Sequence, residues 1–180
     1  MVSSTEDEQS QGEQLPAEFP TAERVREILD SVKDPEIPVV SVVELGIVRD
    51  VEVTGTHVSI TITPTYSGCP AMREIELDIR SALRSAGAGN VTIETVHAPA
   101  WTTDWIGVDA REKLRAYGIA PPGPAAQSGL ITLTHRRADV SCPRCGSRDT
   151  VLQSEFGSTA CKAIHVCNTC REPFDELKAF

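Results

Sequence analysis

Apolar residues first recur at helical spacing shortly after the N-terminus. Four of them stand at positions i, i+3, i+4 and i+7: Val25, Ile28, Leu29 and Val32. Thr21 precedes them and is a suitable N-cap. This pattern predicts an amphipathic helix that starts after Thr21 and ends at Asp34-Pro35, since a residue before proline avoids the α-helical region.

Two β-rich segments follow. Residues His57–Thr63 alternate, with Val58, Ile60 and Ile62 on one face and hydroxyl residues on the other. The short stretch Thr54-Gly55-Thr56 separates this segment from Ile47–Val53. We therefore expect an antiparallel hairpin.

The next apolar pattern is helical and runs from about Pro70 to Ala86, followed by a third strand at Asn90–Val96. Asp109-Ala-Arg-Glu112 has the form of a capping box and predicts a short helix that ends at Tyr117-Gly118. The order αββαβα predicts an α/β (α+β) domain, a small two-layer fold with the helices on one sheet.

Charge separates the first residues from the rest. The chain of 180 residues has a net charge of −9, and residues 1–20 contain five acidic and no basic residues. We expect residues 1–20 to be a disordered acidic tail. This balance argues against a nucleic-acid partner. No apolar run is long enough for a membrane span and no secretory signal is visible, so a cytoplasmic location is expected, where thiols stay reduced.

Proline and glycine mark a linker at residues 119–134, although Leu130–Thr134 has the pattern of a strand. It separates an assembly-type domain at 21–118 from a cysteine-rich module at 135–180. Two CxxC motifs supply four cysteines in this module: Cys142, Cys145, Cys167 and Cys170. Two such turns can complete a tetrahedral thiolate site, which favours a structural Zn²⁺ in a β-rich ribbon with a hairpin at Thr150–Phe156 and Cys161–Val166.

Cys161 and His165 leave the metal assignment open. With Cys161 as a fifth thiol the set suits an iron–sulfur cluster as well as zinc. Alternatively Cys161 packs as a small apolar residue. His165 is interpreted as a partly buried strand residue.

Cys69 is the one cysteine outside the ribbon, in the stretch Thr63-Pro-Thr-Tyr-Ser-Gly-Cys-Pro70. With Pro70 at the first helical position, Cys69 would be the N-cap, where free N–H groups and the helix dipole favour a thiolate. The residue would then suit a nucleophile or a metal ligand. A buried structural cysteine is the alternative, and a Cys–His pair would need His97 to approach it.

Several motifs occur in the order found in one known family of domains: Asp34-Pro-Glu-Ile-Pro38, Glu44-Leu-Gly-Ile-Val48, Thr63–Pro70 and Ala100-Trp-Thr-Thr-Asp104. Together they resemble the SufT-like iron–sulfur assembly domains over about Thr21–Gly118. Three further segments resemble the ribbon of the PaaD family of phenylacetate-degradation proteins: Cys142–Ser147, Phe156–Lys162 and Cys167–Phe174. One departure is the C-terminal Glu176-Leu-Lys-Ala-Phe180, which lacks a cysteine found in the family and so favours zinc over a cluster.

The resemblance implies a maturation factor for the iron–sulfur or di-iron centre of the multicomponent phenylacetyl-CoA epoxidase. Cys69 would be the transient ligand for iron or an iron–sulfur cluster, with Asp34 and Glu36 in support. Implied partners are the oxygenase and reductase subunits and the iron–sulfur assembly machinery, with a homodimer left open. Neither nucleic acid nor membrane is an expected partner.

Three other functions compete with maturation: a non-catalytic structural subunit of the epoxidase, an independent thiol enzyme, and a nucleic-acid-binding ribbon. The sequence does not contain the pair of Glu-x-x-His motifs of a di-iron site, and it has no dinucleotide-binding fingerprint. We therefore expect any oxidoreductase activity to belong to the complex, with this chain not catalytic by itself.

Overall fold

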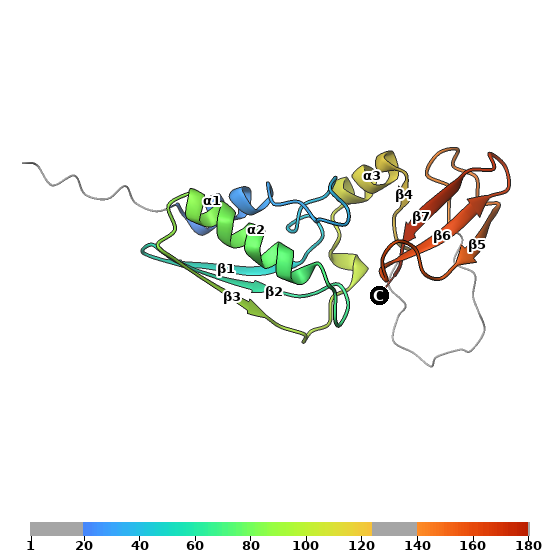
Figure 1. The fold of residues 1–180 in the computed structure, drawn as a ribbon. Coiled ribbons are helices and arrows are strands. Elements are labelled where there is room, and N and C mark those ends of the chain that lie inside the picture. The colour runs from blue at the N-terminus through green and yellow to red at the C-terminus, as the bar shows by residue number, and fades with distance from the viewer. Residues whose placement is uncertain (1–19, 124–139, 180) are drawn as a thin grey trace, which may run out of the picture.

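The computed structural model describes residues 20–123 and 140–179, which form an α/β domain followed by a β-ribbon (Figure 1). The elements of the first domain are α1 (Ala22–Leu29), β1 (Val48–Thr54), β2 (His57–Ile62), α2 (Met72–Ser85), β3 (Asn90–Thr95), a 3-10 turn η1 (Thr103–Trp105) and α3 (Val108–Tyr117). The order αββαβα predicted from the sequence is confirmed.

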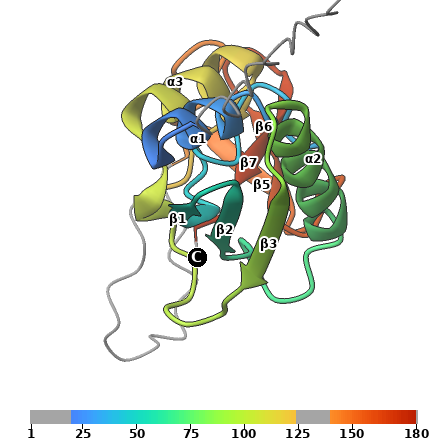
Figure 2. The same cartoon turned by 90° about the vertical axis from the view of Figure 1, so that its left-hand side faces the viewer.

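The first sheet has the order β1-β2-β3. β1 and β2 form the expected antiparallel hairpin, and β2 pairs with β3 in parallel. The alternation of β2 holds, since Val58, Ile60 and Ile62 are fully buried. Figures 1 and 2 show α1 and α2 on the same face of this sheet, so the apolar stripes of both helices meet β2 in the core.

Helix α1 begins as predicted, because the Thr21 hydroxyl accepts a hydrogen bond from the backbone N–H of Arg24. Its end was predicted too late. The helix stops at Leu29, since the backbone of the next segment pairs with another loop: Val42 N–H donates to Val32 O, and Asp34 N–H donates to Val40 O. Tertiary hydrogen bonds thus end the helix before the proline can.

Helix α3 differs at its start. Its N-cap is Gly107 and no side-chain hydrogen bond caps it, so the expected capping box at Asp109 is wrong. Gly107 N–H instead donates to Glu44 O, which fixes the chain at this position. The predicted end at Tyr117 is confirmed, with Gly118 in the left-handed conformation that glycine adopts readily.

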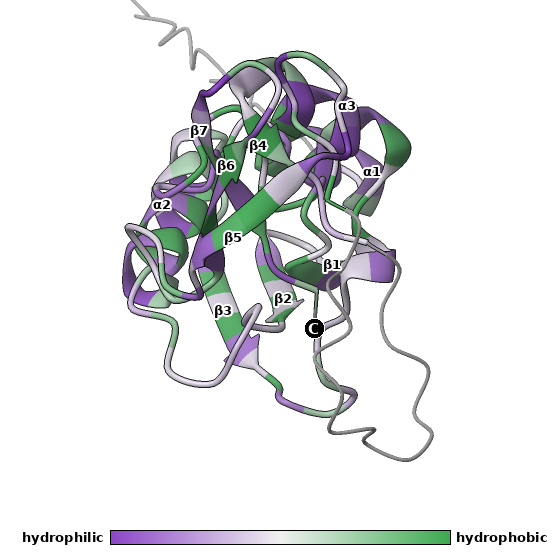
Figure 3. Cartoon of the chain, turned by 90° about the vertical axis from the view of Figure 1, so that its right-hand side faces the viewer, coloured by the Kyte–Doolittle hydropathy of each residue, from purple (hydrophilic) through white to green (hydrophobic). Residues whose placement is uncertain are grey.

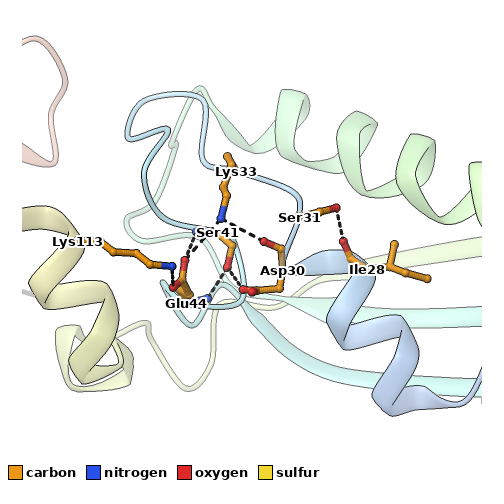
Figure 4. Close-up of polar contacts among 7 residues, drawn as sticks. All are labelled: Ile28, Asp30, Ser31, Lys33, Ser41, Glu44 and Lys113. Carbon is orange, nitrogen blue, oxygen red and sulfur yellow. Dashed lines mark hydrogen bonds and ion pairs between the residues drawn. The ribbon is translucent and has the colours of Figure 1, made fainter. Parts of the chain in front are cut away.

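A polar network fixes the loop between α1 and β1 (Figure 4). Glu44 accepts hydrogen bonds from the ammonium group of Lys113 on α3 and from the backbone N–H of Ser41. The Ser41 hydroxyl in turn donates to the carboxylate of Asp30 at the end of α1. The loop that carries Asp34 is therefore held from both sides by helices.

The ribbon contains β5 (Thr150–Ser154), β6 (Lys162–Cys167) and β7 (Pro173–Leu177), and β4 (Ile119–Ala120) joins its sheet in the order β4-β7-β6-β5. The predicted hairpin is confirmed as β5 and β6, while β7 was missed. β4 lies where the linker was expected to begin. The acidic tail up to residue 19 and most of the expected linker, including Leu130–Thr134, lie outside the described residues, and the domain boundaries stay a prediction.

Strand pairing and a shared apolar core join the two domains in addition to the polypeptide connection. β4 directly follows α3 and pairs in parallel with β7, the last strand of the ribbon. Cys161 and Leu177 of the ribbon are buried in the same core cluster as the helices of the first domain. The ribbon is therefore packed on the α/β domain at the end where α3 lies (Figure 1).

Among the described residues, β5 is an edge strand of the ribbon sheet, and it faces the viewer in Figure 3. Val151 and Leu152 on this strand, and Phe156 just after it, are exposed. Among the described residues, no helix has both the length and the apolar composition that a membrane span needs.

Candidate metal sites

Two turns of the ribbon bring together the four cysteines predicted as ligands. The sulfur atoms of Cys142, Cys145, Cys167 and Cys170 all lie within 4.8 Å of one another. The Sγ atoms of Cys142 and Cys170 are 3.7 Å apart, and those of Cys145 and Cys167 are 3.5 Å apart. The turns come from the segment before β5 and from the β6–β7 connection.

These distances fit a tetrahedral zinc site. A Zn–S bond of about 2.3 Å places neighbouring sulfurs of a regular tetrahedron about 3.8 Å apart. Cys142 and Cys167 are buried, Cys170 is partly buried and Cys145 is exposed, so one side of the site lies at the protein surface. The four-cysteine metal site predicted from the two CxxC motifs is present.

Backbone N–H groups and neighbouring sulfurs act in opposite directions on the thiols of this cluster. The backbone N–H of Cys170 and other nearby donors lower the pKa of Cys167 to about 6. For Cys170, the backbone N–H of Glu172 stabilises the thiolate, but burial and the neighbouring sulfurs raise its pKa to about 12. Sulfurs this close to one another oppose each other's ionisation, so a cation placed among them would stabilise the thiolates.

Cys161 and His165 do not belong to this cluster. His165 is buried on β6, where its Nε2 lies 2.6 Å from a carboxylate oxygen of Glu176 and its ring stacks on Phe174. This agrees with its interpretation as a strand residue. Cys161 lies just before β6 and is buried against the α/β domain.

Cys69 lies three residues before α2, and not at its N-cap. The N-cap is Ala71, and helical structure starts at Met72. The residues before it form turns, with Cys69 N–H donating to Tyr66 O and Met72 N–H donating to Cys69 O. The predicted helix start is therefore wrong, because Pro70 belongs to the preceding turn, and the argument that helix N–H groups hold a thiolate at Cys69 is lost.

The structure offers another setting for Cys69. The residue is partly buried and lines a small cavity of about 20 Å³ between the two domains. The walls of this cavity also include Asp34, Glu36, Trp101 and Cys161. The candidate site thus contains both carboxyl residues that the sequence associated with Cys69, together with a second thiol.

Asp34 is 7% exposed and its side chain closes a tight turn. Its Oδ1 accepts the backbone N–H groups of Glu36 at 2.9 Å and Ile37 at 2.8 Å. Burial raises the pKa of Asp34, and these two hydrogen bonds only partly oppose the effect. The turn places Glu36, which is partly buried, on the same cavity.

Tyr66 links the two thiols electrostatically. Burial raises the pKa of its hydroxyl, and so do the nearby sulfurs of Cys69 and Cys161. Burial also raises the pKa of Cys161, although the Thr159 hydroxyl, 3.0 Å from its sulfur, acts in the opposite direction. Both cysteines therefore act on one side chain at this interface.

His97 lies on a different cavity. That cavity is larger, about 420 Å³, and is lined by residues that include Thr63, Tyr66, Ser67 and His97, but not Cys69. His97 is exposed, and the one Glu-x-x-His in the sequence, Glu94–His97, lies on and after β3 and not on a helix. A Cys–His hydrolase therefore gains no support from the geometry.

Sequence reasoning missed three contributors to the interface. Trp101 is 4% exposed, donates its indole N–H to Leu45 O at 2.9 Å and lines both cavities. Lys162 and Cys161 come from the ribbon. The sequence could not predict that Cys161 lies near Cys69 or that Lys162 contacts Glu36, although the segment Phe156–Lys162 was noted as part of a family motif.

Comparison with known proteins agrees with this two-part structure. Residues 22–95 match a family model described as iron–sulfur cluster assembly protein, and residues 126–178 match one described as PaaD zinc beta ribbon domain. The fold and the four-cysteine site thus define an iron–sulfur assembly domain fused to a zinc-type ribbon. The chain belongs to the PaaD family.

Two relatives carry informative names. One, from Escherichia coli (strain K12), is assigned as a subunit of a 1,2-phenylacetyl-CoA epoxidase and is 47% identical over 159 residues, which cover 88% of this chain and 93% of that protein. Another, from Porphyromonas gingivalis (strain ATCC BAA-308 / W83), is named Fe-S protein maturation auxiliary factor and is 35% identical over 96 residues, 52% of this chain and 90% of that protein.

A solved structure of a domain of unknown function, DUF59, from Bacillus anthracis is 28% identical and has a TM-score of 0.49. The similarity covers 52% of this chain and 90% of that chain.

Proposed function

We propose that this protein is a maturation factor that delivers iron, alone or as an iron–sulfur cluster, to a metal centre of a phenylacetyl-CoA epoxidase. The observation that carries the proposal is the placement of Cys69: a partly buried thiol beside a buried carboxylate, at a cavity between an assembly-type domain and a ribbon. Cys69 is the transient ligand of the cargo. The names of the two relatives, one an epoxidase subunit and one a maturation factor, support the two halves of this role.

The chemistry of the cavity suits iron that must be released again. A thiolate binds ferrous iron and iron–sulfur clusters well, and carboxylate oxygens are weaker ligands. Asp34 and Glu36 line the site from one shared turn. Negative charge on these side chains makes the electrostatic potential at the cavity more favourable for a cation. Partial burial of Cys69 limits contact with solvent while leaving access for a partner.

The ribbon has a different role in this proposal. Zn²⁺ held by Cys142, Cys145, Cys167 and Cys170 would have no open coordination position, so its role would be structural. A module of this size has a small apolar core, so metal ligation contributes much of its stability. The ribbon then acts as a stable wall for the cavity and as a docking module.

The partners in this proposal are the oxygenase and reductase subunits of the epoxidase, with the cellular iron–sulfur machinery as the donor. The experiment replaces Cys69 by Ser in a strain that makes the whole epoxidase. Iron and acid-labile sulfide are then measured in the purified reductase, and iron in the oxygenase. We expect one of these centres to be depleted in the variant, while the zinc content of this protein is unchanged.

A second candidate function follows from the name of the Escherichia coli relative: a structural subunit of the epoxidase. In that case the protein copurifies in fixed ratio with the oxygenase, and Cys69→Ser changes neither metal content nor turnover. Full metal occupancy of both client proteins in the Cys69→Ser strain would reject the maturation role.

A further inference from the structure

Cys161 is not one of the four ribbon ligands, and it lies on the wall of the cavity between the two domains. It is 8% exposed and lies apart from the four ribbon ligands. The Thr159 hydroxyl is 3.0 Å from its sulfur, and the backbone carbonyl of Cys161 accepts the N–H of Lys178. These contacts fix the thiol at the wall of the interdomain cavity that Cys69 also lines.

We infer that Cys69 and Cys161 form one two-thiol site across the domain interface, and that this site takes a single ferrous ion. The inference rests on the proposed function and adds to it a second ligand, from the other domain, and the class of cargo. Each thiol loses its proton to solvent as its sulfur binds the ion. Iron remains ferrous, so no oxidant or reductant is needed.

The volume of the cavity selects the cargo. About 20 Å³ is enough for one water-sized occupant. An iron–sulfur cluster has several iron and sulfide atoms and needs a much larger space. With the domains packed as they are, the cavity fits one ion, and Lys162 holds this packing by donating to Glu36 O at 3.2 Å.

The site is incomplete by itself, which agrees with a role in transfer. Within the described residues, the ribbon cluster is the one group of three or more Cys, His, Asp or Glu whose ligand atoms lie within 4.8 Å of one another. Two thiols therefore leave open positions on the ion. A thiolate of a donor or a client can bind at an open position before the ion leaves, whereas a closed four-ligand site retains its metal.

The test uses the full chain with its ribbon loaded with Zn²⁺, under anaerobic and reducing conditions, and Fe²⁺ as the probe. Iron K-edge X-ray absorption counts the sulfur atoms bound to iron without interference from zinc. We expect one iron per chain with two sulfur ligands and no iron–iron vector. A single sulfur ligand in the wild-type protein, one iron shared by two chains, or an iron–iron vector would each overturn the inference, without dependence on any variant.

Variants then identify the ligands. Cys161→Ser and Cys69→Ser should each leave one sulfur on iron and weaken Fe²⁺ binding at least about tenfold, since even outer-shell changes have effects of this size. Ala160→Ser, at the exposed position next to Cys161, is the matched control and should bind iron like the wild type. Unchanged iron affinity and sulfur number in Cys161→Ser would overturn the two-thiol site.

The outcomes separate this inference from the proposed function. If Cys69→Ser abolishes Fe²⁺ binding and depletes the client, but Cys161→Ser has no effect on the iron site, the delivery role stands and the two-thiol site falls. If both thiols bind iron in the purified protein but client metal content is normal in the Cys69→Ser strain, the two-thiol site stands and the delivery role falls.

Discussion

Lys162 of the ribbon donates a hydrogen bond to the backbone carbonyl of Glu36 in the assembly domain, with 3.2 Å between Nζ and the oxygen. The lysine is 6% exposed, and its ammonium group also lies 3.3 Å from the Ser158 hydroxyl. A buried ammonium needs such partners, because an unpaired one would be costly. This contact therefore fixes the ribbon against the turn that carries Asp34 and Glu36.

Replacing Lys162 by Met should weaken the domain interface while leaving both domains folded. The aliphatic part of the side chain is kept, and a hydrogen bond from a charged donor, about 1.5–3 kcal/mol, is lost. Hydrogen exchange should increase around Glu36 and Cys161. Lys178→Met is the control, because its ammonium group donates to Glu155 O within the ribbon. Equal exchange at the interface in both variants would contradict this role of Lys162.

Removal of the ribbon metal should also expose the cavity between the two domains. The four-cysteine site stabilises the ribbon, and the folded ribbon keeps Cys161 buried against the assembly domain. Chelation should therefore make Cys161 reactive toward a thiol reagent, which is measured by mass spectrometry of labelled peptides. A Cys142→Ser variant should show the same labelling without chelator. If Cys161 stays protected after complete zinc loss, the ribbon wall does not depend on metal.

Glu44→Gln should destabilise the fold at neutral pH and remove part of its acid sensitivity. Partial burial raises the pKa of Glu44, but the Lys113 ammonium and the Ser41 N–H outweigh it and hold this pKa below its ordinary value. The stabilising contribution is complete above the unfolded pKa of about 4.3 and is lost as pH falls through the lower folded value.

We expect Glu44→Gln to lower the free energy of unfolding by about 1 kcal/mol at pH 7, because Lys113 is exposed and the pair is partly screened. Urea unfolding at pH 7 and below pH 4 checks this, with the difference from wild type shrinking in acid. Glu27→Gln, in an exposed pair with Arg24, should have a smaller effect. A loss that is equal at both pH values would point to packing instead of charge.

Asp34→Asn should act in the opposite direction on stability. Burial raises the pKa of Asp34, so the fold favours the protonated carboxyl. That contribution is complete below the unfolded pKa of about 3.9 and is lost as pH rises through the raised folded value. An asparagine can still accept the two backbone N–H groups through its oxygen.

The Asp34→Asn variant should therefore gain stability relative to wild type as pH rises from 3 to 7, as measured by urea unfolding. If Asp34 supports iron at the cavity, the same variant should bind Fe²⁺ less tightly. Asp78→Asn, on the exposed face of α2, is the control and should change neither property. A pH-independent loss of stability would show that the carboxyl is needed for the turn itself.

The sequence predicted those parts of the fold that depend on local patterns. The alternation in His57–Ile62 predicted the hairpin, and the spacing of Val25 and Leu29 predicted the first helix. Both predictions hold because the buried residues repeat every second position in a strand and about every 3.6 positions in a helix. The CxxC spacing predicted the four-cysteine site for a different reason, because each pair of ligands lies within one short turn. The helix, the hairpin and each CxxC turn all form within short segments.

The errors have two causes. A local turn through Tyr66 continues to Ala71, so Cys69 lies before the N-cap. At α3 a distant contact matters, because Gly107, the N-cap in place of Asp109, donates its N–H to Glu44 O. Cys161 faces the Cys69 cavity only because the ribbon packs back onto the first domain. Local spacing contains no record of such packing, so the second thiol could not be predicted.

The parallel pairing of β4 with β7 joins the two domains non-covalently, in addition to the covalent connection through residues 124–139. The stretch before this connection ends in a strand of the ribbon sheet, and Leu177 beyond it contributes to the core of the assembly domain. A protease cut between residues 124 and 139 should accordingly yield two polypeptides that still migrate as one particle. A gene encoding the ribbon alone would produce a sheet without its outermost strand.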